Sequence, residues 1–533
     1  MPDIYEKIIS MAKRRGFLYP SYEIYGGEAG FYDYGPLGVL LKNNIEDKWR
    51  EFYLFKEKFY EISTPIITPY DILKASGHVD EFIDEIATCN RCGASFKIED
   101  LKENRCPICK GDVEKGKLNL MFETFIGAKK KEKAFLRPET AQGIFVNFPF
   151  VYEFFRKKLP FGIIQIGKGF RNEVSPRQGI IRLREFSMAE AEVFFEPDNK
   201  KHPNFCKVKN EKLNLLTKND EEILIEAGKA VEKKIIGNEA LAYYIVLTKK
   251  FLISVGIDEN KIRFRQHKEE ELAHYANECW DAEIYSERFG WVECVGIADR
   301  AAYDLEAHTK HTGIDLRIFR KYDEPKKVKK KIIKPKIEKI GKKYKEKAKE
   351  IIEKLNKIEI NEANKIYING EEIDKELYEI EEIEEVISGE KIFPHVIEPS
   401  YGIDRIFYFI LEHNYKETKK EGEKYVILSL PASIAPIKAG VFPLVNKDGL
   451  PEIAKEIEEN LRRNKIVAFY DDRGSIGRRY ARMDEIGTPF CITVDYQTKE
   501  DDTVTIRFRD TTEQIRINKE EIVKWIKENM EKF

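Results

Sequence analysis

The stretch from Phe170 to Phe186 is the feature that most restricts how this 533-residue chain can fold. A segment that contains Pro176 and Gly179 interrupts it, which is typical of a turn. The residues on either side predict a strand and a returning strand. We therefore expect a hairpin that brings the side chains of two neighbouring strands together.

Charged and aromatic side chains are expected to gather on this hairpin. Because successive side chains on a strand point to opposite faces, Arg171 and Glu173 share one face. The returning strand places three more side chains on one face, namely Arg182, Arg184 and Phe186. Guanidinium groups bind phosphate oxygens, a ring can stack on a base, and a carboxylate accepts from an exocyclic amine. The pattern indicates a nucleoside triphosphate site, although such a hairpin taken alone favours an ordinary salt-bridged surface.

Residues 398–407 form a second element that favours the functional interpretation. Glu398 and Ser400 lie on one face of a short extended segment. Gly402 then opens a helix, and the first turn of that helix presents Arg405.

These two segments together resemble motifs 2 and 3 of class II aminoacyl-tRNA synthetases. Motif 1 has a candidate in Gly35–Gly38, followed by an amphipathic helix expected over Val39–Tyr53. The strings Arg137–Gly143 and Trp291–Arg300 narrow the resemblance to glycyl-tRNA synthetases of the dimeric archaeal and eukaryotic type. The match runs over most of the chain in the right order. It departs from the general class II pattern around Gly402, where motif 3 lacks paired glycines, although the glycyl branch commonly lacks the first.

The resemblance implies an α+β catalytic domain built on an antiparallel sheet, over residues 1–420. Three inserts are expected in it: a zinc module at 86–115, a mixed and largely helical insert at about 200–270, and a charged insert at about 320–390. From Tyr425 onward, apolar strand-like runs alternate with a helix expected near Leu450–Asn464, which predicts a small α/β domain with a mixed sheet. By resemblance, residues 421–533 are the anticodon-binding domain.

The resemblance also implies the reaction, which is ATP-dependent attachment of glycine to tRNA(Gly) through a glycyl-adenylate. Arg171 would hold the α-phosphate, Glu173 the adenine amino group and Arg182 the outer phosphates. Phe186 and Arg405 would enclose the adenine, and Arg171 and Arg405 would be the catalytic residues. Mg²⁺ is expected with the ATP, next to Glu293. The implied ATP-binding residues are Arg171, Asn172, Glu173, Arg182, Leu183, Phe186, Glu293, Cys294 and Arg405.

A glycine pocket follows from the same resemblance. Carboxylates and a hydroxyl suit a primary ammonium and leave little apolar volume, so a larger amino acid is excluded by size and no editing activity is expected. Strand alternation puts Glu190 and Glu192 on one face, so either could be the ligand, and the resemblance selects Glu190. The implied glycine-binding residues are Glu139, Glu190, Arg300, Glu398 and Ser400.

Four of the eight cysteines are patterned. They form two C-x2-C pairs separated by thirteen residues: Cys89 with Cys92, and Cys106 with Cys109. Two such pairs can complete a four-thiolate shell for zinc that leaves no position open for water. Structural zinc is therefore favoured over disulfides, which are rare in cytosolic proteins. The other four cysteines have no metal spacing and are interpreted as packing residues.

Basic and acidic residues nearly balance over the whole chain but gather in separate local runs. The net charge of −2 is the difference between 92 basic and 94 acidic residues, so any nucleic-acid surface must be local. A lysine block at 326–336 is interpreted as either a solvated face or an RNA-contacting arm. The acidic run at 379–385 is expected to be a helix partner or a solubilising surface.

No apolar run approaches the roughly 20 residues needed to span a bilayer, and the N-terminus lacks the layout of a signal peptide. We therefore expect a cytoplasmic protein without membrane contact, and by resemblance a homodimer formed through motif 1. Two alternatives remain: a non-catalytic nucleic-acid-binding paralogue, which would need none of Arg171, Glu173, Arg182 and Arg405, and a sibling class IIa synthetase for proline, threonine, serine or histidine.

Overall fold

The computed structural model describes residues 3–98, 101, 105–128, 132–174, 176, 179–357, 366–368, 370–420 and 422–532. The chain divides into two compact units, Met1–Leu316 with Pro394–Phe533, and Arg317–Phe393. Ser175, Arg177 and Gln178 of the predicted turn lie outside the described residues. No helix within these ranges combines the length and apolar composition that crossing a bilayer would require.

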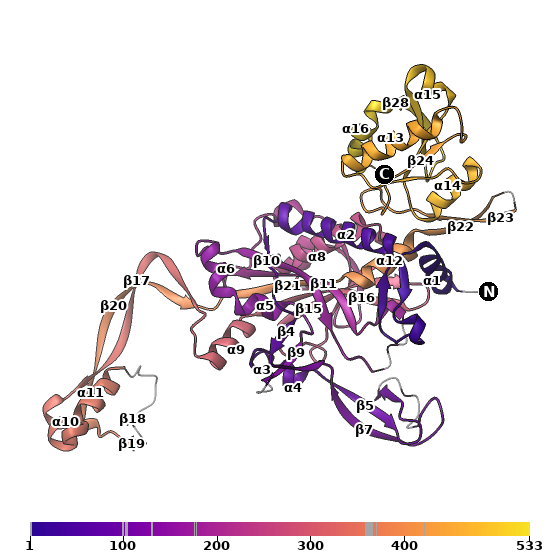
Figure 1. The fold of residues 1–533 in the computed structure, drawn as a ribbon. Coiled ribbons are helices and arrows are strands. Elements are labelled where there is room, and N and C mark those ends of the chain that lie inside the picture. The colour runs from indigo at the N-terminus through magenta and orange to yellow at the C-terminus, as the bar shows by residue number, and fades with distance from the viewer. Residues whose placement is uncertain are drawn as a thin grey trace. The chain divides into compact units, whose positions relative to one another are not determined.

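A nine-stranded sheet organises the larger unit (Figure 1). Most neighbouring strands are antiparallel, as predicted, and only the pairs β12–β14 and β10–β3 are parallel. In spatial order the strands are β13 (Glu222–Glu226), β12 (Lys212–Leu216), β14 (Ile262–Gln266), β15 (Glu278–Ser286), β16 (Gly290–Ala301), β21 (His395–Gly402), β11 (Glu185–Phe195), β10 (Phe161–Phe170) and β3 (Tyr60–Glu61).

Residues 200–270, expected to be a mixed and largely helical insert, contribute three of these strands. They do contain helices α7 (Ala227–Glu232) and α8 (Glu239–Ser254). Alternate residues of β12, Leu213 and Leu215, are fully buried, which is the pattern of a strand with one face in the core. The segment therefore extends the sheet.

Long helices cover one face of the sheet, and the face that carries the site packs against the short helix α5 (Ala141–Val146), which contacts β10 and β11. Helix α8 contacts β15, β16 and β21, helix α12 (Ile403–Asn414) contacts β11, β15 and β16, and α2 (Pro36–Arg50) contacts α12. Tyr401 of β21 points to the helices, where its ring packs against Trp49 and Phe251. Its neighbour Ser400 points the opposite way because side chains alternate along a strand.

The predicted motif 1 helix is confirmed, with its start at Pro36. Gly35 precedes it in extended conformation. Proline is favoured in a first helical turn because N–H groups there have no acceptor within the helix, so the N–H that proline lacks costs no hydrogen bond. Gly38 lets the helix approach the preceding chain: a Cβ there would lie 1.9 Å from the carbonyl oxygen of Phe17. The helix continues as a wider turn over Glu51–Lys56.

The predicted hairpin is only partly correct. β10 ends at Phe170 and β11 begins at Glu185, so Arg171, Glu173 and Arg182 lie in the connecting segment and not on strands. Residues 179–181 form a short 3₁₀ turn that buries Ile180 and Ile181 in the main core. A strand would direct two consecutive side chains to opposite faces, whereas this turn lets both isoleucines reach the same core.

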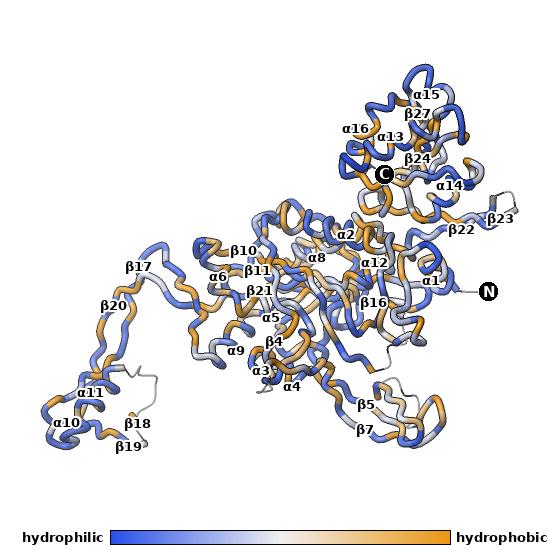
Figure 2. The backbone as a smooth tube through the Cα atoms, in the orientation of Figure 1, coloured by the Kyte–Doolittle hydropathy of each residue, from blue (hydrophilic) through white to orange (hydrophobic). Residues whose placement is uncertain are grey.

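The second unit is a long two-stranded ribbon with a small helical tip (Figure 1). β17 (Ile318–Pro335) pairs antiparallel with β20 (Tyr378–Ile392), and α10 (Ile337–Tyr344) and α11 (Ala348–Lys357) pack against a core that includes Ile340 and Leu355. The ribbon is largely hydrophilic in Figure 2, whereas orange stretches mark the main sheet.

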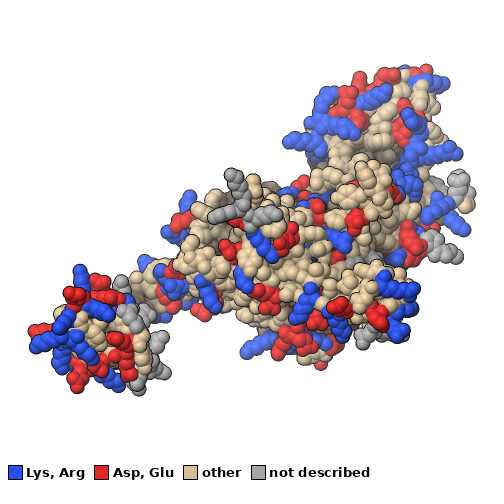
Figure 3. Space-filling view, turned by 60° about the horizontal axis from the view of Figure 1, so that its bottom comes forward, with Lys and Arg blue, Asp and Glu red and all other residues tan. Residues whose placement is uncertain are grey.

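The ribbon brings the lysine block and the acidic run together. Lys329 Nζ lies 3.0 Å from a carboxylate oxygen of Glu382, and Lys336 Nζ lies 2.7 Å from one of Glu379. Figure 3 accordingly shows basic and acidic side chains intermixed on this unit. The expectation that the acidic run pairs with a helix is wrong, because its partner is the lysine-rich strand.

The C-terminal part has its own core and a five-stranded mixed sheet, as predicted. Strand order is β25-β24-β26-β27-β28, with β24 parallel to β25 and β26. The strand-like run from Tyr425 pairs separately, in the two-stranded sheet of β22 (Tyr415–Lys420) and β23 (Glu423–Leu428). The domain consists of β24 (Ala439–Pro443), α13 (Leu450–Arg463), β25 (Ala468–Tyr470), α14 (Ile476–Glu485), β26 (Phe490–Val494), α15 (Tyr496–Asp501), β27 (Thr503–Phe508), β28 (Gln514–Asn518) and α16 (Ile522–Asn529).

Smaller elements complete the larger unit. A three-stranded module carries the patterned cysteines on β5 (Ile83–Cys89), β6 (Ser95–Lys97), β7 (Val113–Asn119) and the loops between them. The remaining elements are α1 (Ile4–Arg15), β1 (Leu18–Pro20), β2 (Tyr32–Tyr34), β4 (Ile67–Pro69), α3 (Tyr70–Ala75), α4 (His78–Glu81), β8 (Glu123–Ile126), β9 (Glu132–Leu136), α5 (Ala141–Val146), α6 (Phe148–Phe154) and α9 (Tyr303–Thr312).

Candidate active site

A cavity of about 330 Å³ opens on the face of the main sheet opposite helices α8 and α12. Its walls combine both predicted sets of residues. The side toward the β10–β11 connection carries Arg171, Glu173, Arg182, Leu183, Phe186, Glu293, Cys294 and Arg405, and the other side carries Glu139, Glu190, Glu398 and Ser400. Two predicted residues, Asn172 and Arg300, do not line it.

Arginines and rings form the first side of the cavity. The guanidinium of Arg171 lies between the rings of Phe82 and Phe186, 5.2 and 5.4 Å from their centroids. Arg182 Nε lies 3.3 Å from a carboxylate oxygen of Glu173. These groups alternate in charge around an aromatic surface, which is the arrangement that a nucleotide's base and phosphates require.

Arg405 forms the facing wall, at the start of α12. Its Nε donates to the carbonyl oxygen of Ile181 at 3.0 Å, and Nη1 donates to the carbonyl oxygen of Glu293 at 2.6 Å. These two bonds tie the Arg405 guanidinium to backbone carbonyl groups and so hold it in place. The Glu293 carboxylate, 3.6 Å away, is half exposed to the cavity. Arg184, by contrast, turns away from the cavity and pairs with Glu28.

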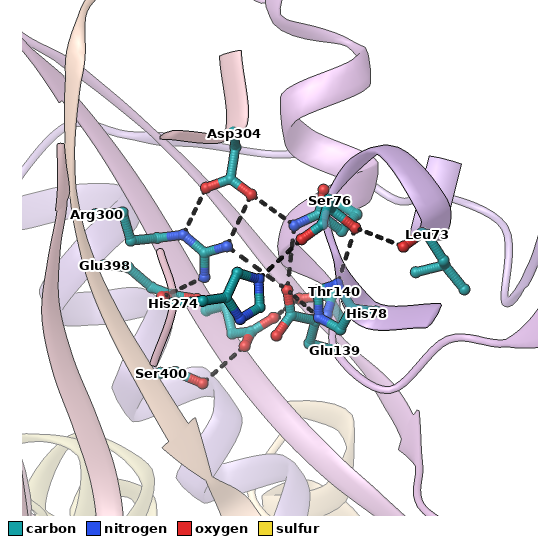
Figure 4. Close-up of polar contacts among 12 residues, drawn as sticks. Leu73, Ser76, His78, Glu139, Thr140, His274, Arg300, Asp304, Glu398 and Ser400 are labelled. Carbon is teal, nitrogen blue, oxygen red and sulfur yellow. Dashed lines mark hydrogen bonds and ion pairs between the residues drawn. The ribbon is translucent and has the colours of Figure 1, made fainter. Parts of the chain in front are cut away.

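Glu190 and Ser400 are directly opposite each other on β11 and β21. Ser400 Oγ donates to Glu190 Oε1 at 2.7 Å, and the backbone N–H of Thr140 donates to Glu190 Oε2 at 2.6 Å (Figure 4). Burial, reinforced by the charge of Glu139, raises the pKa of Glu190 despite these bonds.

Glu398 accepts a hydrogen bond from a fully buried arginine. Arg300 Nη1 donates to Glu398 Oε2 at 2.8 Å, while Nε and Nη2 donate to the two oxygens of Asp304 at 2.8 and 2.9 Å (Figure 4). The ring of Tyr275 covers the guanidinium at 3.7 Å. Burial raises the pKa of Glu398 to about 8; Glu190 and Glu139 add to the rise, and Arg300 opposes it.

Glu139 has the opposite electrostatic character. Its Oε1 is approached by three donors: Gln142 Nε2 at 3.3 Å, His78 Nε2 at 3.3 Å and Arg300 Nη2 at 3.9 Å. Burial acts to raise the pKa of Glu139, but His78, Arg300 and the Gln142 hydrogen bond outweigh it and hold the pKa well below its usual range. Glu139 is therefore a carboxylate at neutral pH, whereas Glu398 titrates near it.

Glu192 lies outside the cavity lining, so of the two alternatives on β11 it is Glu190 that faces the cavity. Glu192 is fully buried, and neither of its carboxylate oxygens has a hydrogen-bond partner among the described residues. Burial, followed by the charge of Glu398, raises its pKa well above the ordinary value.

Several residues of this site escaped the sequence analysis as individuals. Thr140 and Gln142 lie inside the Arg137–Gly143 string and could have been found there. Asp304 follows Arg300 by four residues, a spacing compatible with an ion pair. His78 and Tyr275 come from distant segments and carry no local signal.

The patterned cysteines converge in a second site, separate from the cavity. Their sulfur atoms all lie within 4.8 Å of one another; Cys89 and Cys109 are 3.4 Å apart, and Cys92 and Cys106 are 3.6 Å apart. Four thiolates about 2.3 Å from one tetrahedral ion would be separated by about 3.8 Å. Gly111 leaves room beside them, because a Cβ there would lie 3.2 and 3.3 Å from two of the sulfurs. The cluster therefore fits a tetrahedral metal ion.

A further group at the cavity wall, His267, Cys279 and Asp281, also lies within ligand distance. Asp281 already pairs with Arg265 at 3.0 Å and with His267 at 2.8 Å. The Arg265 guanidinium and the hydrogen bond with His267 satisfy the Asp281 carboxylate without a metal ion.

Comparison with known proteins shows which family the chain resembles. Residues 438–529 match the family model described as "Anticodon binding domain". The chain is 52% identical over 576 residues to the glycine–tRNA ligase of Methanocaldococcus jannaschii and 50% identical over 565 residues to that of Pyrococcus furiosus, covering 99% of each chain.

Solved structures agree at the level of the fold. A prolyl-tRNA synthetase of Giardia lamblia, in complex with prolyl-adenylate, is 15% identical with a TM-score of 0.56, over 99% of this chain and 79% of that one. A prolyl-tRNA synthetase of Cryptosporidium parvum with L-proline and AMP is 13% identical with a TM-score of 0.53, over 100% and 76%. With half of its residues identical to those relatives along nearly its whole length, and a cavity that brings the predicted arginines and glutamates together, the chain belongs to the glycine–tRNA ligase family.

Proposed function

We propose that the cavity is the place where this enzyme activates glycine with ATP and transfers it to tRNA(Gly). The carboxylate oxygen of glycine attacks the α-phosphorus of ATP, the bond to pyrophosphate breaks, and glycyl-adenylate forms. A ribose hydroxyl at the tRNA 3′ end then attacks the glycyl carbonyl and AMP leaves. The observation that carries this proposal is the junction, in one cavity, of an arginine-rich wall and a carboxylate-rich wall.

Neither step requires a protein nucleophile, so catalysis consists of positioning and charge stabilisation. Arg171 holds the α-phosphate and balances the charge that builds up there. Arg405, fixed by two backbone carbonyls, closes over the adenine opposite Phe186. Glu173 accepts from the adenine amino group, and Arg182 holds the outer phosphates. Glu293 is a carboxylate open to the cavity and suits Mg²⁺, which would neutralise phosphate charge when bound with ATP.

Glycine recognition depends on unused oxygen atoms. Within the described residues, Glu139 Oε2 and Glu398 Oε1 accept no hydrogen bond, whereas both oxygens of Glu190 are engaged by Thr140 and Ser400. The ammonium of glycine donates to these oxygens. Arg300 is fully buried and does not line the cavity, so it acts on glycine through Glu398, to which its Nη1 donates, and not by touching the glycine carboxylate. Three carboxylates and a hydroxyl leave little apolar volume in the pocket, so alanine is rejected by size and editing is unnecessary.

Two alternative functions are less well supported. A non-catalytic nucleic-acid binder would have no need of Arg171, Glu173 and Arg405 around one cavity. A synthetase for proline would need an apolar pocket for the pyrrolidine ring, whereas three carboxylates, those of Glu139, Glu190 and Glu398, line this cavity. The likeness to prolyl-tRNA synthetases concerns the fold alone.

ATP–pyrophosphate exchange with each of the twenty amino acids tests the assignment directly. We expect exchange with glycine alone.

Glu139→Gln should raise the KM for glycine by about 10-fold or more, because an amide cannot replace a charged hydrogen bond to the ammonium. Glu513→Gln, an exposed change in the C-terminal domain, is the control. Exchange with another amino acid would contradict the pocket assignment.

The dependence of the glycine KM on pH follows from Glu398. With a pKa of about 8, this carboxyl is protonated in the free enzyme below pH 8, and an ammonium binds well only to the carboxylate. Glycine binding therefore releases a proton, and the KM should rise as the pH falls from 8 to 6, by at most about 10-fold per pH unit. Steady-state KM values for glycine at saturating ATP measure this. A glycine KM that does not change with pH, or a pH dependence that is unchanged in Glu398→Gln, would argue against this role of Glu398.

We also propose that the four-cysteine cluster holds a structural zinc ion. All four ligands are protein thiolates, so no position is left for substrate, and the ion would hold the three-stranded module together. Cys92→Ser should abolish the stoichiometric zinc that the parent protein carries, measured by elemental analysis. Cys206→Ser changes an exposed cysteine outside the cluster and should keep the metal. A zinc-free parent protein would contradict the proposal.

The homodimer is proposed to form at the motif 1 end of the sheet. β3 ends the sheet there, and exposed rings surround it: Phe150 is 75% exposed, Phe154 is 61% exposed, and the Tyr60 ring contacts Phe154 at 5.0 Å. A second copy of this chain would remove these rings from water, whereas a monomer leaves a large apolar patch exposed. The enzyme acts in the cytoplasm, where its substrates are.

Light scattering during size-exclusion chromatography should give a mass near twice 62.4 kDa for the parent protein. Phe150→Asp with Phe154→Asp should give the monomer mass, because charges cannot be buried unpaired in such an interface. Leu224→Asp places a charge on an equally exposed apolar residue at the other end of the sheet and should stay dimeric. A monomeric parent protein would refute the proposal.

A further inference from the structure

His78 is a buried histidine beside the glycine pocket that no part of the proposed mechanism uses. It begins α4 and is only 3% exposed, and Ser76 next to it is 1% exposed. It does not line the cavity. A buried polar side chain costs free energy unless it is hydrogen-bonded, so its partners indicate what it does.

Both ring nitrogens of His78 have partners. Nδ1 lies 2.8 Å from Ser76 Oγ, and Nε2 lies 3.3 Å from Glu139 Oε1 (Figure 4). Ser76 Oγ also lies 3.3 Å from the carbonyl oxygen of Leu73 and can donate its one proton to only one of the two. If it donates to His78, the neutral ring carries its proton on Nε2. The contact of Ser76 Oγ with Nδ1, at 2.8 Å, is shorter than its contact with Leu73, and a carboxylate beside Nε2 favours the tautomer whose proton is on Nε2. Nε2–H therefore points at Glu139.

This bond determines how the Glu139 carboxylate is oriented. His78 and Gln142 both approach the same oxygen, Oε1, from which Arg300 is 3.9 Å away. With Gln142 and His78 both on Oε1, the other oxygen, Oε2, has no hydrogen-bond donor among the described residues, and Glu139 lines the cavity. A carboxylate that lost the His78 contact could rotate, and its charge would no longer be presented in a single direction.

The backbone around His78 is fixed from the opposite side. Gly77 has a φ of +86°, and a Cβ there would lie 2.8 Å from His274 Nε2. The same His274 Nε2 lies 3.0 Å from the carbonyl oxygen of Ser76. The turn that carries His78 is thereby held against the segment whose next residue, Tyr275, covers Arg300. Only glycine fits this left-handed, closely packed position.

We propose that His78 is a positioning residue for the glycine ammonium, acting through Glu139 and not through the nucleotide side of the site. The inference rests on the proposed role of Glu139 as a glycine ligand. Its consequence is selective: loss of His78 weakens glycine binding more than ATP binding. The polar partners of His78 are Ser76 and Glu139, and its one approach to the nucleotide side among the described residues is a ring contact with Phe82, centroid to centroid 5.9 Å, on which the Arg171 guanidinium lies.

The test compares His78→Ala, His78→Gln, Glu139→Gln and the double variant His78→Ala with Glu139→Gln. The KM values for glycine and for ATP are measured by ATP–pyrophosphate exchange, and folding is checked by thermal unfolding. His78→Ala should raise the glycine KM about 10- to 100-fold, the usual range for a lost hydrogen bond to a charged group, and change the ATP KM less than about twofold. His78→Gln should restore much of the affinity, because a glutamine side-chain amide can donate from nearly the position of Nε2.

The double variant separates the possible outcomes. If His78 acts through Glu139, His78→Ala should have little further effect on glycine KM once Glu139 is Gln. Equal effects in both backgrounds would overturn the proposal, as would a parallel rise in the ATP KM or a lack of rescue by His78→Gln. An unchanged glycine KM in Glu139→Gln would instead refute the ligand role of Glu139, and an unchanged KM in His78→Ala alone would refute only the role of His78.

Discussion

The burial of several carboxyl groups around one guanidinium is the constraint on which the rest of the site depends. Glu139, Glu190, Glu398 and Asp304 are all buried close to Arg300, which is itself fully buried. Charges removed from water cost several kcal/mol each unless they are paired and hydrogen-bonded. One guanidinium cannot neutralise this set, so protons must remain on part of it, and the raised pKa values of Glu190 and Glu398 reflect this. An ammonium ion supplies the missing positive charge.

The sheet makes such a cluster possible because one of its faces packs against apolar side chains while the other presents carboxyl groups to the cavity. Along β21, Tyr401 packs among the rings of the helices, while Glu398 and Ser400 point into the cavity. β11 repeats the pattern with Glu190 directly opposite Ser400. The apolar face stabilises the strands, and the strands in turn hold the glutamates at fixed separations that flexible loops could not maintain.

Much of this was predictable from the sequence, and the exceptions have physical reasons. Residues inside short strings, such as Glu398, Ser400 and Arg405, were placed by resemblance and do line one cavity, because the spacing that a strand and a helix start impose on such strings is a local property. The path of the chain between β10 and β11 was not predicted correctly, because the burial of Ile180 and Ile181 overrides strand geometry. His78 could not be found, since its contact with Glu139 joins segments sixty-one residues apart. Likewise, the lysine block gave no sign that its partner was the acidic run some fifty residues later.

The pairing of lysines with glutamates along the ribbon determines how far its electric field extends. Because opposite charges sit within about 3 Å of each other across β17 and β20, their fields cancel beyond roughly the Debye length of 8 Å at physiological salt. The ribbon is therefore a row of short dipoles and not a positive arm. It cannot attract a polyanion from a distance, and any partner that it has must be recognised only after contact.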